Sequence, residues 1–347
     1  MAEKLMKAAR LHQYGEPIKL EQVPIPEIIN PDEVLVRVKA CGLCHTDIRI
    51  SSGQQPPRKL PIILGHEPAG IIEEIGPGVT TLKVGDRVSV DSMISCGHCH
   101  NCFIGSDNLC SSSLSLGFDW DGGWAEYMLA PSANCFVIPE EVSFEEGAII
   151  TDAVATTFHA MRIGEVTVGD VVAIFGIGGL GVNAIQMAKA FGAAKVIAVD
   201  RKPEKRELAL ALGADEAVDL NSPTLRKELK VLSGGDGVNV AFEFIGVDST
   251  IQKAIESVRK GGKAVLVGLV TGTFQVNGFM LVAKEVQIRG VWTSIKQDYP
   301  AVIELVRSGK VDLSRSITHR LPLEEINHGL EILESREGNP LRIVVMT

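Results

Sequence analysis

The stretch VVAIFGIGGLGVNAIQMAKAFGAAKVIAVDRKPEK, residues 171–205, decides the fold of the chain. It begins with a continuous apolar run, 171–175, whose lack of helical spacing predicts a buried strand. The glycine-rich segment 176–181 comes next, and apolar residues then recur at helical spacing as far as Phe191. A second apolar run, 196–199, ends at Asp200. This order predicts a strand, a tight turn, a helix and a second strand parallel to the first.

The glycines of the turn suit the binding of a dinucleotide. Gly176 allows the chain to turn off the strand, Gly178 lets a pyrophosphate approach the backbone, and Gly181 lets the helix pack closely on the strand. Free N–H groups at the start of the helix attract phosphate charge. The expected turn contacts are Gly176, Ile177, Gly178, Gly179, Leu180 and Gly181.

The acidic residue that ends the second strand bears on the choice of dinucleotide. Asp200 is placed to accept hydrogen bonds from ribose hydroxyls, and its charge disfavours a 2′-phosphate, so NAD is favoured over NADP. Arg201 and Lys202 follow at once. They either soften that repulsion, in which case Arg201 belongs to the cofactor site, or form a solvated basic tip.

Length and composition restrict the class of protein. The chain has 347 residues, enough for two domains, with 45% hydrophobic and 22% charged residues. Its net charge of −9 argues against a nucleic-acid-binding protein. No window approaches a membrane span, and residues 1–10 lack the apolar core of a signal peptide, so we expect a cytoplasmic protein with no membrane partner.

Four of the seven cysteines lie within residues 96–110, spaced C-x2-C-x2-C-x7-C. Four thiolates on a short loop can close around one structural zinc and leave no open position for a substrate. An iron–sulfur cluster is the main alternative. The expected ligands are Cys96, Cys99, Cys102 and Cys110. We expect Cys135 in the core, and His98 and His100 facing solvent.

The remaining pattern predicts an α/β protein of two domains. β-type segments fill residues 1–40, 71–90 and 115–139, and helical spacing covers 144–162. After that, strands and helices alternate, which predicts a doubly wound parallel sheet. The expected domains are 1–154 with both metal sites, 155–295 for the dinucleotide, and 296–347 completing the first. The expected helices are 203–212, 223–232 and 249–259, and the expected strands lie near 217 and at 124–129, 238–244, 263–268 and 286–291.

A second set of side chains that could bind a metal or take part in catalysis lies near the start of the chain. Residues 41–50, CGLCHTDIRI, place a thiolate, an imidazole, a hydroxyl and a carboxylate side by side, and Gly65-His66-Glu67 follows. Cysteine and histidine with acidic neighbours are typical zinc ligands. Taken singly, Cys44 is equally a small buried residue, and His66 a core histidine.

In chain order, CxxCHTD, GHE, the four-cysteine loop and the glycine turn together resemble the zinc-dependent alcohol dehydrogenases of the medium-chain dehydrogenase/reductase family. The resemblance covers essentially the whole chain, and the four-cysteine loop is its most specific part. It implies a chaperonin-10-like, β-rich catalytic domain and a Rossmann domain. It also implies NAD, two zinc ions per chain, a small alcohol or carbonyl substrate, and a homodimer or homotetramer formed through the 286–291 strand.

The resemblance assigns roles to single residues. Cys44, His66 and Asp152 would bind a catalytic zinc; many members have cysteine at the last position. Glu67 would be a transient ligand, and Asp47 would orient His66 through its other ring nitrogen.

The mechanism implied by the family starts from an alcohol whose pKa the metal lowers. Thr46 would take its proton and pass it towards the cofactor ribose, and hydride would leave for the nicotinamide. Arg49 stands where many members have a relay histidine, and it cannot act as a base near neutral pH. We therefore expect the proton to leave through water or His45, and Arg49 to contact the cofactor's phosphates.

Further cofactor contacts follow from the resemblance, although core packing competes as an explanation for each. Lys205 would contact the ribose, and Phe244 and Ile245 the adenine. The nicotinamide half would meet Leu180, Thr156, Gly268, Leu269, Val291 and Thr293.

Two other functions remain open. Ser92 occupies a position that is aromatic in some members, which leaves room for a polyol, sugar or threonine, while Trp120 and Trp292 narrow the space again. A non-enzymatic zinc protein that binds nucleic acid through the cysteine loop is a distant alternative, opposed by the acidic composition and by the intact glycine turn.

Overall fold

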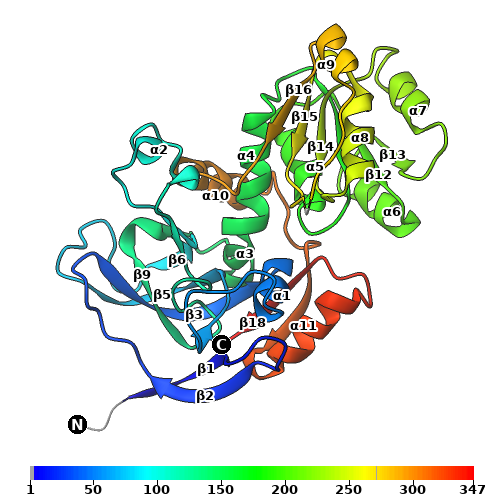
Figure 1. Ribbon diagram of the computed structural model, residues 1–347. Coiled ribbons are helices and arrows are strands. Elements are labelled where there is room, and N and C mark those ends of the chain that lie inside the picture. Colours follow the sequence, from blue (N-terminus) through cyan, green and yellow to red (C-terminus); the bar gives the residue numbers. More distant parts are fainter. Residues whose placement is uncertain (1–3, 271) are drawn as a thin grey trace. The chain divides into compact units, whose positions relative to one another are not determined.

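The computed structural model describes residues 4–270 and 272–347, which divide into two units (Figure 1). Unit 1 holds the described part of Met1–Asp152 together with Ile295–Arg307 and Leu313–Thr347. Unit 2 holds Ala153–Ser294 and the short segment Ser308–Asp312. The division falls after Asp152 and after Ser294, where the sequence analysis had placed boundaries after 154 and 295. The addition of 308–312 to Unit 2 was not foreseen.

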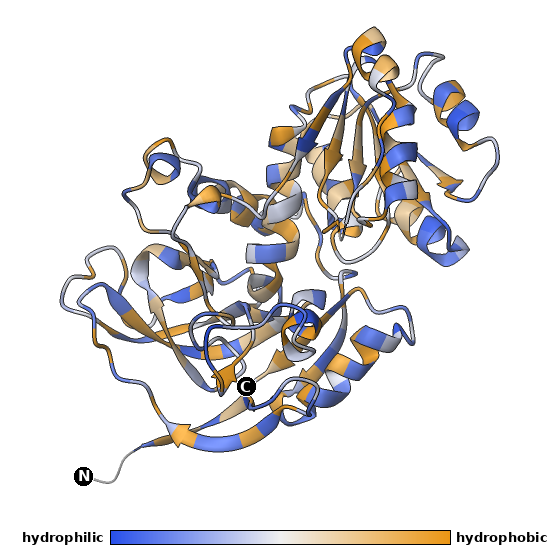
Figure 2. Ribbon diagram, viewed as in Figure 1, coloured by the Kyte–Doolittle hydropathy of each residue, from blue (hydrophilic) through white to orange (hydrophobic). Residues whose placement is uncertain are grey.

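Unit 2 is built on a six-stranded sheet in the order β13-β12-β11-β14-β15-β16, with parallel pairing throughout. The central strands β11 and β14 consist mainly of apolar residues and are almost entirely buried, as a sheet covered by helices requires. Figure 2 shows these strands as mainly hydrophobic. The strands are β11 (Val171–Phe175), β12 (Lys195–Asp200), β13 (Glu216–Asp219), β14 (Val238–Glu243), β15 (Val258–Leu266) and β16 (Gln287–Gly290).

The helices of Unit 2 connect these strands and cover the sheet. The segment 181–188 of α5 is buried at every residue, whereas α6 and α7 carry hydrophilic residues on their outer faces (Figure 2). The helices are α4 (Ala155–Ile163), α5 (Gly181–Ala190), α6 (Pro203–Ala211), α7 (Leu225–Leu232), α8 (Asp248–Ser257) and α9 (Gly278–Lys284). The doubly wound parallel sheet predicted from the alternating pattern is therefore confirmed.

Unit 1 is built mainly of β structure. Its seven-stranded sheet has the order β10-β6-β5-β3-β18-β17, with β9 also paired to β3, and β2-β1-β4 form a second sheet. Because β18 pairs with β3, the last part of the chain completes the sheet begun by the first part. The strands are β1 (Leu5–Leu11), β2 (Lys19–Pro24), β3 (Glu33–Leu43), β4 (Ile62–Ile63), β5 (Glu67–Ile75), β6 (Arg87–Val90), β7 (Met93–Ile94), β8 (Leu114–Ser115), β9 (Tyr127–Pro131), β10 (Cys135–Val137), β17 (Ile317–Pro322) and β18 (Arg342–Met346).

A bulge in β3 sets the direction of its last residues. Val34, Val36 and Val38 pack in one apolar cluster, while Cys41 and Leu43 pack in another. The pairing of β3 with β5 shifts in register between Val38 and Ala40. An extra residue in a strand reverses which face its side chains meet. One strand can therefore serve two clusters.

The helices of Unit 1 are short, and one expected helix is interrupted. They are α1 (His45–Ser51), α2 (His100–Phe103), α3 (Phe144–Ile149), α10 (Tyr299–Arg307) and α11 (Ile326–Ser335). The helical structure expected over 144–162 is confirmed, but it is not one regular α-helix: α3 ends at Ile149, and Ile150–Val154 form a π-helical turn before α4. A π turn inserts one residue into the helical repeat, so it changes the direction in which Asp152 points.

Two expected strands also have different bounds. The strand expected at 124–129 begins only at Tyr127, because the residues before it pair with β1 through the single bridge Ala8–Ala125, and the Trp124 N–H donates to the Leu64 carbonyl. The strand expected at 263–268 begins at Val258 and ends at Leu266, and the Gly261-Gly262 turn lies within it as a bulge. Cys135 is buried, and His98 and His100 are exposed.

Over the described residues, no helix combines the length and the apolar character that crossing a membrane requires.

The buried carboxyl of Asp91, which follows β6, should make the stability of Unit 1 depend on pH. Burial raises its pKa to about 7, against the opposing effects of the Met93 N–H and of Lys296. The folded protein thus keeps this proton at pH values where the unfolded chain has lost it. The stability that the group contributes is complete below about pH 4 and is lost as the pH rises through 7.

We expect Asp91→Asn to flatten the dependence of the unfolding free energy on pH between 4 and 8. Relative to the variant, the wild type should lose up to a few kcal/mol over this range, at about 1.4 kcal/mol per pKa unit. Urea unfolding at a series of pH values measures the difference. Asp32→Asn, at an exposed residue, is the control, and its unfolding free energy should depend on pH in the same way as that of the wild type. Parallel curves for Asp91→Asn would contradict the assignment.

Candidate metal centres and dinucleotide site

Helix α1 positions the first side chains of the site. Cys44 is its N-cap, and Asp47, in the first turn, accepts a hydrogen bond from the Cys44 backbone N–H at 2.9 Å. The other oxygen of Asp47 lies 3.0 Å from Nδ1 of His66. Asp47 is completely buried. One carboxylate therefore fixes both the loop that carries Cys44 and the ring orientation of His66.

Four potential ligands meet in Unit 1. Cys44, His66, Glu67 and Asp152 each offer one ligand atom, and these atoms lie within 4.8 Å of one another. Since Nδ1 of His66 faces Asp47, its Nε2 faces the cluster, 3.9 Å from Oε1 of Glu67. Thiolate, imidazole and carboxylate together form a donor set that zinc accepts.

Glu67 itself indicates that a cation fits here. It is fully buried, and its Oε2 has no hydrogen-bond partner among the described residues. Gly42, opposite Glu67 in the sheet, makes room for the carboxylate, since a Cβ at Gly42 would lie 2.2 Å from that Oε2. A buried acceptor without a donor is costly unless a ligand satisfies it. A metal ion in the cluster would satisfy it.

Arg342, the cation of this cluster, was not predicted from the sequence. Its guanidinium, on β18 and almost completely buried, donates to Oε1 of Glu67 at 2.8 Å and to Oδ2 of Asp152 at 3.3 Å. An arginine that opens the apolar run 342–346 was a visible anomaly in the sequence. Nothing local, however, pairs it with residues 275 and 190 positions away.

The pKa values in the cluster reflect this crowding. Burial raises the pKa of Glu67 well above its usual range. Burial also opposes the ionisation of Asp152, but the positive charges of Arg342 and His66 hold its pKa below its usual value. Glu67 therefore holds a proton more readily than Asp152 does. Because metal ligands bind in deprotonated form, a cation entering the cluster would release protons.

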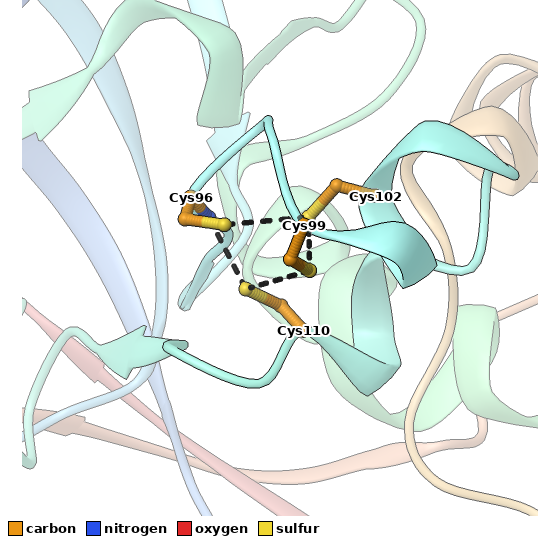
Figure 3. Close-up of side chains that lie close together, drawn as sticks. All are labelled: Cys96, Cys99, Cys102 and Cys110. Atoms are coloured by element: carbon orange, nitrogen blue, oxygen red, sulfur yellow. Dashed lines mark hydrogen bonds between the residues drawn. The ribbon is translucent and has the colours of Figure 1, made fainter.

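The four cysteines of the 96–110 loop face one another (Figure 3). The Sγ separations are 4.0 Å for Cys96–Cys102, 3.5 Å for Cys99–Cys102 and 3.9 Å for Cys99–Cys110. A tetrahedron with metal–sulfur bonds of about 2.3 Å has edges of about 3.8 Å, so the cluster fits one structural zinc. A multi-iron cluster would place iron and sulfide between the thiols and needs wider spacing. Backbone N–H groups of Cys102 and Ser111 lower the pKa of the Cys99 thiol, which favours the thiolate.

In Unit 2, the three glycines of the turn have three different surroundings. Gly176 has φ +91°, a conformation that other residues rarely adopt. A Cβ at Gly181 would lie 2.0 Å from the Gly176 carbonyl oxygen, so the start of α5 packs directly on the turn. A Cβ at Gly178 would meet nothing within 4 Å. The open space is thus at Gly178, where a pyrophosphate is expected to approach.

The backbone of the turn offers free donors. The N–H groups of Gly178, Gly179 and Leu180 have no acceptor among the described residues, although the N–H of Ile177 donates to Oδ2 of Asp200 at 2.8 Å. The other oxygen of Asp200 accepts from the Lys202 N–H at 2.9 Å. Asp200 is therefore held in place at the carboxyl end of β12, beside the turn.

Neighbouring loops adjoin the turn at the same edge of the sheet. A Cβ at Gly176 would meet Ile245 at 2.6 Å, and one at Gly268 would meet the Gly246 nitrogen at 2.4 Å. The fully buried Glu243 holds the first of these loops, because its carboxylate accepts from the N–H groups of Ile245 and Gly246. Glu243 was not predicted as a functional residue, although an acidic residue at the end of the mainly apolar strand 238–243 is visible in the sequence.

The other predicted residues fall into one unit or the other. Thr46 Oγ1 lies 3.8 Å from the Cys44 sulfur, His45 is exposed, and Arg49 is half-buried, all three on α1 of Unit 1. The remaining cofactor candidates are in Unit 2. Thr156 is buried on α4, and its hydroxyl has no hydrogen-bond partner within the described part of the chain; Lys205 is half-buried on α6, and Arg201 is exposed. Phe244 follows β14, Leu269 follows β15, and Val291 and Thr293 follow β16.

Comparison with known proteins agrees with this geometry. Residues 30–140 match the family model of the alcohol dehydrogenase GroES-like domain, and residues 179–308 match that of zinc-binding dehydrogenases. An alcohol dehydrogenase of Geobacillus stearothermophilus is 42% identical over 324 residues, 93% of this chain and 94% of that protein. A sorbitol dehydrogenase of Bacillus subtilis is 35% identical over 346 residues, 98% of this chain and 97% of that protein.

Solved structures show the same fold. The structure of a zinc-binding dehydrogenase from Sinorhizobium meliloti, bound to NADP, superposes with a TM-score of 0.92 at 31% identity. The superposition covers 99% of this chain and all of that one (100%).

The Arg342 ion pairs should be essential to the stability of Unit 1. Arg342→Met leaves the fully buried Glu67 and the half-buried Asp152 without their cation and should cost about 3 kcal/mol of unfolding free energy, while Arg342→Lys should lose less. Urea unfolding in the presence of a chelator measures this, because no bound metal then replaces the missing charge. Equal stability of the methionine variant and the wild type would refute the role.

Substitution of Gly178 should affect dinucleotide binding, whereas substitution of Gly181 should affect stability. Gly178→Ala meets open space, so it should keep the wild-type melting temperature but weaken dinucleotide binding by about tenfold, since the methyl group occupies the phosphate's place. Gly181→Ala forces α5 off the turn and should lower the melting temperature. Thermal unfolding and NADH fluorescence titration distinguish the two. Undiminished NADH binding by Gly178→Ala would count against the turn as the phosphate site.

Proposed function

We propose that this protein, which belongs to the zinc-dependent alcohol dehydrogenases of the medium-chain dehydrogenase/reductase family, transfers hydride between a primary or secondary alcohol and NAD. The observation that carries the proposal is the meeting of Cys44, His66, Glu67 and Asp152. It is supported by the open, donor-rich glycine turn in the same chain.

Cys44, His66 and Asp152 would hold the catalytic zinc, which when bound supplies a Lewis acid that lowers the pKa of the substrate hydroxyl. Together, one thiolate and one carboxylate neutralise a divalent cation, and the imidazole stays neutral. Asp47 holds the histidine ring in place. Glu67 lies within reach as a transient ligand, and its ion pair with Arg342 is positioned to hold its carboxylate away from the metal at other times.

The residues of α1 would move the proton. Thr46 Oγ1 lies next to the thiol of Cys44, so its hydroxyl is placed to accept a proton from an alcohol held there. His45, the next residue back, is exposed and can pass the proton to water. Arg49 stays protonated near neutral pH, so in our proposal it contacts the cofactor's phosphates.

Asp200 supports NAD as the preferred cofactor. Its two oxygens already accept backbone N–H groups, so the negative charge cannot swing away from the ribose position. A 2′-phosphate there would meet a fixed carboxylate. The relative from Sinorhizobium meliloti binds NADP, which makes the comparison of the two cofactors a direct test.

A polyol or sugar alcohol is the second candidate substrate. Ser92 is a small residue where some family members carry an aromatic one, and a relative over nearly the whole chain is a sorbitol dehydrogenase. Trp120 would restrict the size of the substrate.

We further propose a homodimer or homotetramer that forms through β16. This strand is the last in its sheet and pairs only with β15 among the described strands. An edge strand of this kind can pair with a second copy. Light scattering of the purified protein would test the assembly, and a monomer would refute it.

Activity is tested by the absorbance of the reduced cofactor, with NAD or NADP and a panel of substrates. Primary, secondary and cyclic alcohols, polyols and threonine form the panel. We expect turnover of simple alcohols with NAD, and Asp200→Ala should narrow the preference for NAD over NADP by about tenfold or more, because the repelling charge is gone. Turnover only of polyols or threonine would move the proposal to the second candidate. No turnover in protein that binds NADH would refute both.

Metal content should be two zinc ions per chain. Cys44→Ala should remove one zinc and the activity, Cys99→Ser should remove the other zinc and lower the melting temperature, and the buried Cys135→Ser should keep both. Elemental analysis of the purified proteins measures the stoichiometry. Iron instead of zinc, or a Cys44→Ala protein that retains two ions, would refute the assignment.

A further inference from the structure

A cationic pocket lies in Unit 2 at the amino ends of the sheet strands, whereas the glycine turn lies at their carboxyl ends. It has a volume of about 410 Å³ and is lined by the first residues of two neighbouring strands, Val258 of β15 and Gly237 just before β14. The glycine turn follows the carboxyl end of β11, which is parallel to β14. The pocket is therefore separate from the dinucleotide site.

Five cationic side chains from three elements line this pocket. Arg226 and Lys230 lie one helical turn apart on α7, Lys284 ends α9, and Arg259 and Lys260 lie in β15. The acidic residues of the lining are Asp236 and Glu256. Over residues 4–270 and 272–347, none of the five cations is in an ion pair. The pocket therefore has an excess of uncompensated positive charge.

A bulge in β15 brings two of these cations to the pocket. Between its pairs Val238–Val258 and Val240–Lys263, β14 advances by two residues while β15 advances by five. The additional residues leave the ladder and carry Arg259 and Lys260 with them. Bulges of this kind redirect side chains and often accompany functional sites.

Helix dipoles account for only part of the cluster. Cations are favoured near helix C-termini, which describes Lys230 near the end of α7 and Lys284 at the end of α9. Arg226, however, is in the first turn of α7, where the dipole disfavours a cation. Arg259 and Lys260 are in a strand. Helix dipoles therefore do not account for the convergence of all five cations.

The surroundings of Lys284 show the unfavourable electrostatics of the pocket when no ligand compensates it. Burial lowers the pKa of this ammonium group, and the charges of Arg226, Lys230 and Lys260 lower it further, while Glu256 opposes the shift. Lys284 is half-buried and the other four cations are exposed, so their mutual repulsion is screened by solvent but would be relieved by a bound anion.

We propose that this pocket binds a small anion that carries two or more phosphate groups. Arginine and lysine are the side chains that recognise phosphate, arginine by paired N–H groups and lysine as a point charge. The limited volume and the acidic residues at its wall favour a compact ligand over an extended polymer. The proposal does not depend on the dehydrogenase activity.

Calorimetric titration with inorganic tripolyphosphate, at about 0.15 M salt to screen weak surface contacts, tests the proposal. We expect binding both with and without saturating NAD. Lys284→Gln and Arg226→Gln should each weaken it by about tenfold, and Glu256→Gln should tighten it, because the variants remove an attracting or a repelling charge. Lys227→Gln, an exposed lysine of α7 outside the pocket, is the matched control and should bind as the wild type does.

Thermal unfolding excludes a purely structural role. Without ligand, Lys284→Gln should melt at or above the wild-type temperature, because a repelling charge is removed. Tripolyphosphate should raise the melting temperature of the wild type but not of the Arg226→Gln/Lys284→Gln double variant. Three results would each overturn the proposal: no binding by the wild type, undiminished binding by the double variant, or binding that NAD abolishes.

Discussion

The ion pair between Arg342 and the carboxylates of Glu67 and Asp152 is the interaction on which Unit 1 depends. Burying an isolated charge is very costly, and breaking a buried pair costs more than a surface pair ever contributes. The partners come from segments that are far apart in the chain, and β18, which carries Arg342, follows the segment that forms Unit 2. The cluster therefore exists only in the folded unit, where Asp47, also fully buried, holds its histidine.

In Unit 2, different groups able to attract phosphate lie at the two ends of the strands of one parallel sheet. At the carboxyl ends of the strands, the turn at Gly176 and the loops held by Glu243 expose backbone N–H groups and open space. At the amino ends, side chains rather than backbone supply the positive charge, because helix C-termini there present carbonyl groups. The two ends can thus attract phosphate by different means, backbone donors at one and cationic side chains at the other.

The predictions that the structure and the comparisons confirmed rest on motifs whose residues lie close together in the sequence. Strand, glycine turn, helix and strand are contiguous, so their order alone specified a parallel doubly wound sheet. The four cysteines lie within one loop, and their spacing alone indicated a closed metal site. The family followed from the order of four such motifs. Arg342, Glu243 and the bulge in β15 were not predicted, because each acts through partners that are distant in sequence or through a register that only the sheet defines.

The amino-acid sequence by itself determined which residues can bind a metal or a dinucleotide, since donor chemistry and glycine conformation are local properties. Only the tertiary structure decided how their charges are balanced. The π turn at Ile150–Val154 directs Asp152 towards Cys44 and His66, and sheet pairing places Arg342 beside it. Electrostatic energy depends on distance through space, so a buried cation acts on carboxylates that no sequence window contains.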